Sequence, residues 1–341
     1  MLAQAPLLIK HFDAILYMYQ KIREPVENDF QEVNKFIVEQ LHSEVSLVES
    51  IGHYIVEAGG KRMRPTLVLL AARGNGIESD LHIPMAAVIE FIHTATLLHD
   101  DVVDMSQLRR GRPTVNAEWN NPSSVLVGDF IYSRAFQILV QISDMKIMEI
   151  IANTTNRIAE GEVLQLIEKS NPQTTEENYM RVITNKTAIL FQAAAQCGAI
   201  LSKSDSTIEK ALQSFGMQLG LAFQLIDDVL DYSGTAEELG KNVGDDLSEG
   251  KSTLPLIYAS KNGSPTQKGV ILDSLTAEKL TKEMLENVIE IVQDCGGIDY
   301  TKTLAENKAE SAANYLLMNL PPSNYRDSLE KMVEFSITRK I

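Results

Sequence analysis

Two short acidic stretches constrain this chain more than any other feature of its sequence. Each reads Asp-Asp-x-x-Asp inside an otherwise apolar segment, and together they hold Asp100, Asp101, Asp104, Asp227, Asp228 and Asp231. On a helix, the first and last carboxylates of each stretch share a face and the middle one lies on the flank. Like charges this close repel, so a purely structural helix has little reason to group them. Bridged by divalent cations they become a site, since carboxylate oxygens are the ligands that Mg²⁺ prefers.

Basic residues cluster at two places, although the chain as a whole is acidic. The formal net charge of −15 argues against a nucleic-acid partner, which would need a basic face. The clusters lie at residues 61–64, directly after Gly59-Gly60, and at residues 109–112, directly after the first acidic stretch. Arginine binds phosphate through two parallel hydrogen bonds, and paired glycines let the backbone approach an anion. The sequence therefore predicts a phosphate site beside the metal site.

The hydrophobic pattern predicts an all-α fold. Apolar residues recur at three- and four-residue spacing almost throughout, and strand-like alternation is scarce. No composition shift marks a linker and no internal repeat is visible, so we expect a single domain over 1–341 with 1–27 as an N-terminal helical extension. Expected helices cover 28–57, 122–142 and 146–169, and three amphipathic helices follow residue 277.

The remaining composition fits a soluble globular protein, with 44% hydrophobic and 23% charged residues. Cys197 and Cys295 are expected to be reduced, inert thiols. No apolar run is judged to reach transmembrane length, and the N-terminus lacks the architecture of a signal peptide. We expect a cytoplasmic protein or, for a eukaryotic source, a plastid or mitochondrial one with a transit peptide outside this sequence.

Isolated polar residues add weaker signals. His93 precedes the first acidic stretch by seven residues and faces the same way, although a single histidine is more often a core residue than a ligand. Lys186 and Thr187 place a cation and a hydroxyl before an alanine-rich helical run. Two Gly-Lys pairs, ending in Lys241 and Lys251, follow the second acidic stretch and indicate a lid that carries charge to a ligand.

The chain carries, in this order, Gly-Gly-Lys, the first acidic motif, Arg-Arg-Gly-x-Pro, Lys-Thr, the second acidic motif and the loop Gly-Lys. In this combination it resembles the trans-type isoprenyl diphosphate synthases. The resemblance extends from the region of Lys61 to the C-terminus. It implies antiparallel helices around a deep central cavity, usually in a homodimer. It also implies that isopentenyl diphosphate is added to an allylic diphosphate, farnesyl or geranylgeranyl. The implied cofactor is Mg²⁺, about three ions per site, with Mn²⁺ as an alternative.

Carried over position by position, the resemblance assigns roles to the site residues. The metal ligands would be Asp100, Asp104, Asp227 and Asp231, supported by Asp101 and Asp228. The allylic diphosphate would be clamped by Arg109, Lys186, Thr187, Gln224 and Lys241, with Lys251 closing over it. Isopentenyl diphosphate would be bound by Lys61, Arg64, His93 and Arg110. The cations would stabilise negative charge on the leaving diphosphate, so that the allylic C–O bond ionises.

Product length is implied to depend on residues below the first motif. Thr96 lies one helical turn, ~5.4 Å, below Asp100, with Ala95 beside it and Ile92 two turns down. In the family, bulky aromatic residues at the positions of Ala95 and Thr96 give short products. Because both are small here, we predict a long-chain polyprenyl diphosphate synthase, similar to solanesyl diphosphate synthases, that supplies quinone side chains.

Three alternatives remain open. A shorter-chain geranyl, farnesyl or geranylgeranyl diphosphate synthase is disfavoured by the small Ala95 and Thr96. A class I terpene cyclase would carry Asn/Asp-x-x-Ser/Thr-x-x-x-Glu in place of the second acidic motif. A regulatory subunit of a heteromeric synthase would tend to lose one motif, whereas both are intact. Because the implied product is hydrophobic, we also expect the protein to make peripheral contact with a membrane.

Overall fold

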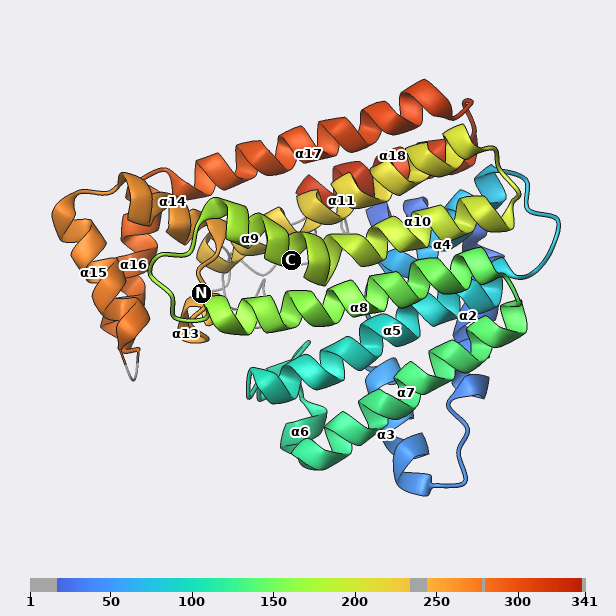
Figure 1. Cartoon of the computed structure of the whole chain (residues 1–341), viewed down its shortest axis with the longest axis horizontal. Helices are drawn as coiled ribbons and strands as arrows, with labels where there is room; N and C mark the ends of the chain where they lie inside the picture. Colours follow the sequence, from blue (N-terminus) through green and yellow to red (C-terminus); the bar gives the residue numbers. More distant parts are fainter. Residues whose placement is uncertain (1–16, 234–243, 278–279, 339–341) are drawn as a thin grey trace, which may run out of the picture.

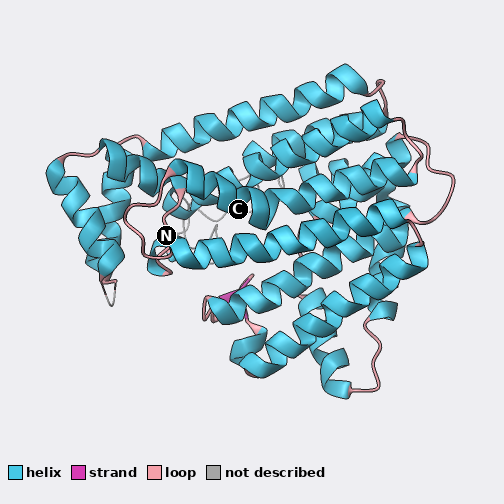
Figure 2. Ribbon diagram, viewed as in Figure 1, coloured by secondary structure: helices cyan, strands magenta, loops and turns pink. Residues whose placement is uncertain are grey.

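The computed structural model describes residues 17–233, 244–277 and 280–338. Nearly all of these residues are helical, and most of the long helices run side by side as a bundle (Figures 1 and 2). The strands within the described ranges are β1 (Leu108–Arg109) and β2 (Arg112–Pro113), which pair antiparallel as a small hairpin. The all-α prediction is therefore confirmed.

After a helical stretch at 17–23, the elements follow one another with short connections. In chain order they are η1 (Glu24–Val26), α2 (Glu27–Gln40), α3 (Ser46–Glu57), α4 (Met63–Gly74), α5 (His82–Val103), α6 (Val115–Glu118), α7 (Asn121–Ile142), α8 (Met145–Glu168), α9 (Glu176–Ile183), η2 (Thr184–Ala188), α10 (Ile189–Leu201), α11 (Ser206–Ser233), α13 (Asp245–Ser248), α14 (Leu254–Asn262), α15 (Pro265–Thr276), α16 (Lys282–Asp294), α17 (Gly297–Asn319) and α18 (Asn324–Thr338).

Two long helices carry the acidic motifs and are held by their neighbours along much of their length. α5 packs against α7 and α4, and α11 packs against α17 and α10. Local sequence fixes where the flanking helices begin: the Asn120 side chain accepts from Ser123 N at the start of α7, and Asp144 accepts from Lys146 N and Ile147 N at the start of α8. The motifs therefore project from a scaffold with defined helix starts.

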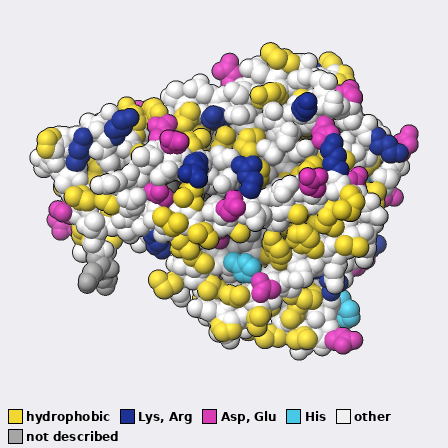
Figure 3. All heavy atoms as spheres, in the orientation of Figure 1, with side chains coloured by type: hydrophobic (Ala, Val, Ile, Leu, Met, Phe, Trp, Pro, Cys, Tyr) yellow, Lys and Arg dark blue, Asp and Glu magenta, His cyan; other side chains and the backbone are white. Residues whose placement is uncertain are grey.

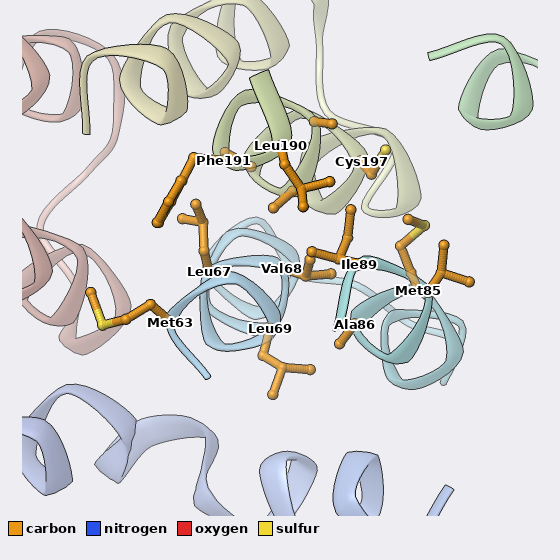
Figure 4. Packing of buried hydrophobic residues seen from close by; sticks show 14 of the residues in the cluster. Met63, Leu67, Val68, Leu69, Met85, Ala86, Ile89, Leu190, Phe191 and Cys197 are labelled. Atoms are coloured by element: carbon orange, nitrogen blue, oxygen red, sulfur yellow. The ribbon is translucent and has the colours of Figure 1, made fainter. Parts of the chain in front are cut away.

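The core between these helices is built from interlocking aliphatic side chains. Figure 4 shows Leu67 of α4 beside Phe191 of α10, and Val68 of α4 near Ile89 of α5 and Leu190 of α10. All five side chains are buried. Cys197 of α10 lies in the same cluster, where burial raises the pKa of its thiol. Cys197 and Cys295 are both free, and the inertness expected of their thiols stays a prediction.

The expected helix over 28–57 is wrong in one respect, because it is interrupted between α2 and α3. The Ser43 hydroxyl accepts a hydrogen bond from Val45 N, an arrangement that competes with helical backbone bonding. Beyond the break, Val45 and Leu47 are exposed, whereas Phe30 and Ile37 of α2 are buried. The apolar stripe therefore does not continue along one face.

The expectation that no apolar run reaches transmembrane length is corrected by α7. This helix, Asn121–Ile142, is long and apolar enough to span a membrane by length and composition, and 39% of its apolar window is buried inside the protein. The helix is this apolar because Asp129 and Arg134 are its only acidic or basic side chains. The buried face of α7 packs against α5, so part of this apolarity belongs to the core.

Candidate active site

The first acidic motif lies at the C-terminal end of α5. Asp100 and Asp104 line one small cavity together with Glu162 of α8, so the prediction that they share a helix face is confirmed. Asp101 points elsewhere: it is 2% exposed and accepts two-pronged hydrogen bonds of 2.7–3.1 Å from the Arg109 guanidinium. Burial raises the pKa of Asp101, and Arg109 acts in the opposite direction. The middle aspartate therefore anchors Arg109.

The hairpin after the motif fixes the two arginines. β1 and β2 are joined by Arg110 and Gly111, whose φ angles of 53° and 73° are those of a turn with two left-handed central residues. Asparagine or glycine would adopt this backbone more cheaply than arginine. An arginine held in an unfavourable conformation is evidence that its side chain has a purpose there.

Two lysines reach the first motif from distant parts of the chain. Lys186 Nζ lies 3.2 Å from Asp100 Oδ2 and 2.7 Å from Glu162 Oε2. Lys251 Nζ lies 2.7 Å from Asp104 Oδ2 and 2.6 Å from Glu249 Oε2. Burial disfavours both ammonium ions, but the neighbouring carboxylates outweigh it and raise the pKa of each lysine.

Lys186 is presented by an irregular piece of helix. η2, Thr184–Ala188, is a single π-helical turn between α9 and α10, and such turns are frequent at functional sites. Gly161 of α8 faces this turn, and a Cβ there would lie 2.9 Å from Lys186 N. The absence of a side chain at 161 is what allows α8 to approach the backbone of Lys186.

The second motif is organised by hydrogen bonds around Asp228. This buried carboxylate accepts from the Tyr179 hydroxyl and from Gln224 Nε2, the latter at 2.8 Å. The Thr187 hydroxyl donates to Gln224 Oε1 at 2.9 Å, which links η2 to α11. Burial and the charge of Asp246 raise the pKa of Asp228 well above its ordinary range. Asp228 therefore holds Tyr179 and Gln224 in place, and its supporting role in a metal site stays a prediction.

The outer aspartates of the second motif differ in exposure. Asp227 is half-buried, whereas Asp231 is fully buried and lies 3.3 Å from the backbone N of Asp246, which donates to its Oδ2. The loop that carries Asp246 is thereby attached to α11. Lys241, which the sequence assigns to this loop, lies outside the described residues.

Three of the four predicted isopentenyl diphosphate residues, Arg64, His93 and Arg110, lie close together beside α5. Arg64 Nη1 lies 3.3 Å from His93 Nε2, and burial together with Arg64 lowers the pKa of His93 well below its ordinary value. A Cβ at Gly60 would lie 2.7 Å from the Arg110 guanidinium, so Arg110 lies against the backbone next to Lys61, whose Nζ is 5.3 Å from the centre of the Phe335 ring. Arg64, Arg110 and Arg109 therefore place positive charge around a neutral His93.

A cavity of about 120 Å³ lies between η2, α9, α11 and the loop after α13. Its wall includes the following residues with polar side chains: Gln165, Glu168, Lys169, Thr174, Tyr179, Lys186, Thr187, Gln224, Asp228, Asp246, Lys251, Ser252 and Thr253. Four of the residues predicted for the allylic diphosphate clamp therefore share one cavity wall. This space is small for a long hydrocarbon, since pockets for drug-sized ligands are several-fold larger.

The predicted chain-length residues do not line this cavity or the one beside Asp100 and Asp104. Ala95 and Ile92 are fully buried in the main core cluster, and Thr96 is half-buried, with its hydroxyl donating to His93 O. Their influence on product length stays a prediction.

The donor set at the first motif fits a hard divalent cation. Asp100 and Asp104 supply carboxylate oxygens on one helix face, and each already holds a cationic ammonium group. Within the described ranges, no three His, Cys, Asp or Glu side chains are close enough to enclose a metal ion. In this structure the ammonium groups of Lys186 and Lys251 lie next to Asp100 and Asp104, where a divalent cation would bind.

Sequence reasoning missed Glu162, Glu249 and Tyr179. Glu162 and Gln165 interrupt the apolar pattern of α8, which is a usable signal, because a polar pair on an inward-facing helix surface needs partners. Tyr179 and Glu249 carried no such signal.

Comparison with known proteins identifies the family of this chain. The family described as polyprenyl synthetase matches residues 45–292. The octaprenyl diphosphate synthase of Escherichia coli is 50% identical over 320 residues, covering 94% of this chain and 98% of that protein. The all-trans-nonaprenyl-diphosphate synthase (geranyl-diphosphate specific) of Rhodobacter capsulatus is 47% identical, with 94% and 98% covered.

The crystal structure of a polyprenyl synthase from Caulobacter crescentus, complexed with calcium and isoprenyl diphosphate, matches with a TM-score of 0.92 at 40% identity, covering 95% of this chain and 98% of that one. The helical bundle with paired acidic motifs defines an isoprenoid synthase of the all-α class. This chain belongs to the polyprenyl synthetase family, and it is a prenyltransferase.

Proposed function

We propose that this protein is a trans-polyprenyl diphosphate synthase that adds isopentenyl diphosphate head-to-tail to farnesyl or geranylgeranyl diphosphate and releases a long-chain product for quinone side chains. The observation that carries the proposal is the meeting of Asp100, Asp104, Lys186 and Lys251 at one place, from three separate parts of the chain. The relatives at 47–50% identity bear the names of octaprenyl and nonaprenyl synthases, which favours a product of that size over a geranylgeranyl one.

The side chains present would act mainly on the diphosphates. Lys186, Lys251 and Arg109 would stabilise the negative charge that grows on the leaving diphosphate, and Thr187 with Gln224 would orient its oxygens. Arg64, Arg110 and Lys61 would hold the second diphosphate beside a neutral His93. The helical walls would keep water from the allylic cation until the isopentenyl double bond attacks it.

Mg²⁺ is the proposed cofactor, with Asp100, Asp104, Asp227 and Asp231 as ligands and Asp101 and Asp228 in support. When bound, Mg²⁺ would act as a Lewis acid on the diphosphate oxygens. The calcium in the Caulobacter crescentus structure supports a divalent ion of this kind. About three ions per site, and Mn²⁺ as a substitute, belong to the same proposal.

We propose a homodimer that uses the outer faces of α7 and α8. Figure 3 shows a broad area of hydrophobic side chains over these helices. Its exposed members include Leu126, Val140, Met145, Val163 and Ile167. A patch this apolar on paired helices is typical of an interface. We also propose that the protein contacts a membrane surface when it releases its product. It would act as a single domain in the cytoplasm.

The test is a product assay with the purified chain, Mg²⁺, labelled isopentenyl diphosphate and each of geranyl, farnesyl and geranylgeranyl diphosphate. We expect a ladder that ends in long polyprenols after dephosphorylation. A single short product would support the shorter-chain alternative, and a cyclised hydrocarbon would support the cyclase. Chromatography with light scattering, comparing wild type with Leu126→Glu, tests the dimer.

A further inference from the structure

Each lysine at the first motif is shared between an aspartate of the motif and a glutamate outside it. Lys186 lies between Asp100 and Glu162, and Lys251 lies between Asp104 and Glu249. The two arrangements come from different elements, since Glu162 belongs to α8 and Glu249 directly follows α13. The same arrangement of one aspartate, one lysine and one glutamate thus occurs twice, once for each outer carboxylate of the motif.

The geometry allows each lysine to move away from its aspartate while it keeps the ion pair with its glutamate. The Lys186 ammonium is closer to Glu162, at 2.7 Å, than to Asp100, at 3.2 Å. Lys251 is within 2.7 Å of both of its carboxylates. All four partner side chains are at most about one quarter exposed, so a lysine without any carboxylate would be a costly partly buried charge.

We propose that Glu162 and Glu249 are positioning residues that take over Lys186 and Lys251 when a divalent ion claims Asp100 and Asp104. In the free protein the lysines neutralise the two aspartates. In the loaded protein the glutamates keep both ammonium groups beside the site, ready for diphosphate oxygens. This inference rests on the proposed function, in which the first motif binds metal and the lysines bind diphosphate.

The proposal has a clear consequence for metal affinity in the absence of any diphosphate. If Lys251 competes with the metal for Asp104, removing its ammonium group should tighten metal binding. We therefore expect Lys251→Met to strengthen metal binding on the order of tenfold. Removing the alternative partner should have the opposite effect, because Lys251 is then left with Asp104 alone. We therefore expect Glu249→Gln to weaken metal binding several-fold.

Mn²⁺ binding followed by electron paramagnetic resonance, on the full chain without diphosphate, provides the test. The decisive comparison is Glu249→Gln in the wild-type and in the Lys251→Met background, a double-mutant cycle. If Glu249 acts through Lys251, its replacement weakens Mn²⁺ binding in the wild type and has little effect when the lysine is absent. Equal weakening of Mn²⁺ binding by Glu249→Gln in both backgrounds would mean a simple loss of negative charge and would overturn the proposal. Failure of Lys251→Met to tighten Mn²⁺ binding would overturn it as well.

The matched control is Glu160→Gln. Glu160 lies on α8 two residues from Glu162, is exposed, and accepts from Asn156 instead of from a lysine. It reports the effect of removing one nearby negative charge. A second double-mutant cycle, with Glu162→Gln and Lys186→Met, repeats the test at Asp100. If a substitution inside α8 unfolds the protein, the cycle of Glu249 with Lys251 is sufficient to test the proposal. Because the readout is metal binding, a wild type that binds Mn²⁺ but makes no prenyl product would refute only the proposed function.

Discussion

Gly161 of α8 lies directly against the backbone of Lys186, so that a Cβ at position 161 would be 2.9 Å from Lys186 N and 2.9 Å from Asn185 Cβ. One contact must shift if any side chain is added, and the contacted atoms belong to the π-helical turn that presents the lysine. The close approach of two helices thus determines where a functional ammonium group lies.

Gly161→Ala should therefore lower activity more than stability alone explains. We expect destabilisation of about 1–3 kcal/mol from overpacking, and a further loss in kcat as Lys186 is displaced from Asp100. Gly269→Ala is the matched control, since Gly269 lies in α15 with no atom near its added Cβ and should gain slightly in stability. Urea unfolding and steady-state kinetics of both variants measure the difference, and equal behaviour of the two would contradict the argument.

Asp100→Ala and Asp227→Ala should abolish turnover while the fold persists. We expect a loss of at least ~10²-fold in kcat, because the charge on the leaving diphosphate would lack its counterion. Lys186 keeps Glu162 as a partner in Asp100→Ala, so its charge is not left unpaired. Circular dichroism and the product assay measure fold and turnover. Near-normal turnover in either variant would remove that aspartate from the metal site.

Replacement of Ala95 or Thr96 by phenylalanine tests the chain-length assignment. We expect shorter products from both variants, with a stability cost of ~1–3 kcal/mol at the fully buried position 95. Thr96, which is half-buried, should tolerate the larger ring better. Product sizing by mass spectrometry, alongside thermal unfolding, separates the two effects. Long products from a stable Thr96→Phe would exclude Thr96 from the floor of the product site.

His93 should make stability depend on pH. Burial and Arg64 lower its pKa well below 6.5, so below that pH the unfolded chain binds a proton that the folded protein does not. Stability should therefore fall as the pH drops from about 6.5 toward the folded pKa, and remain unaffected by this group above 6.5. His93→Gln should flatten that part of the curve. Urea unfolding of wild type and variant between pH 5 and pH 7.5, roughly the range of histidine titration, gives the slopes, and parallel slopes would contradict the assignment.

The helical periodicity predicted the faces of α5 correctly, because i and i+4 side chains must lie together on any helix. The break between α2 and α3 escaped prediction because no glycine or proline marks the end of α2 at Gln40, and the Ser43 hydroxyl accepts from Val45 N only within the connection that follows. The pairs Lys186–Glu162 and Lys251–Asp104 could not be read from sequence, since 24 and 147 residues separate their members. Only the packing of α8 and of the loop after α13 onto α5 brings them together.

The uninterrupted course of α5 has a consequence for how such a chain can change over time. His93, Thr96, Asp100 and Asp104 belong to one continuous stretch of helical backbone or its cap. One inserted residue between Thr96 and Asp100 would turn the carboxylates by ~100° relative to His93. Substitutions along this stretch leave the relative orientation of these side chains unchanged, whereas insertions and deletions would turn the two proposed diphosphate sites away from each other. The number of residues between His93 and Asp104 should therefore vary less than the identities of most residues between them.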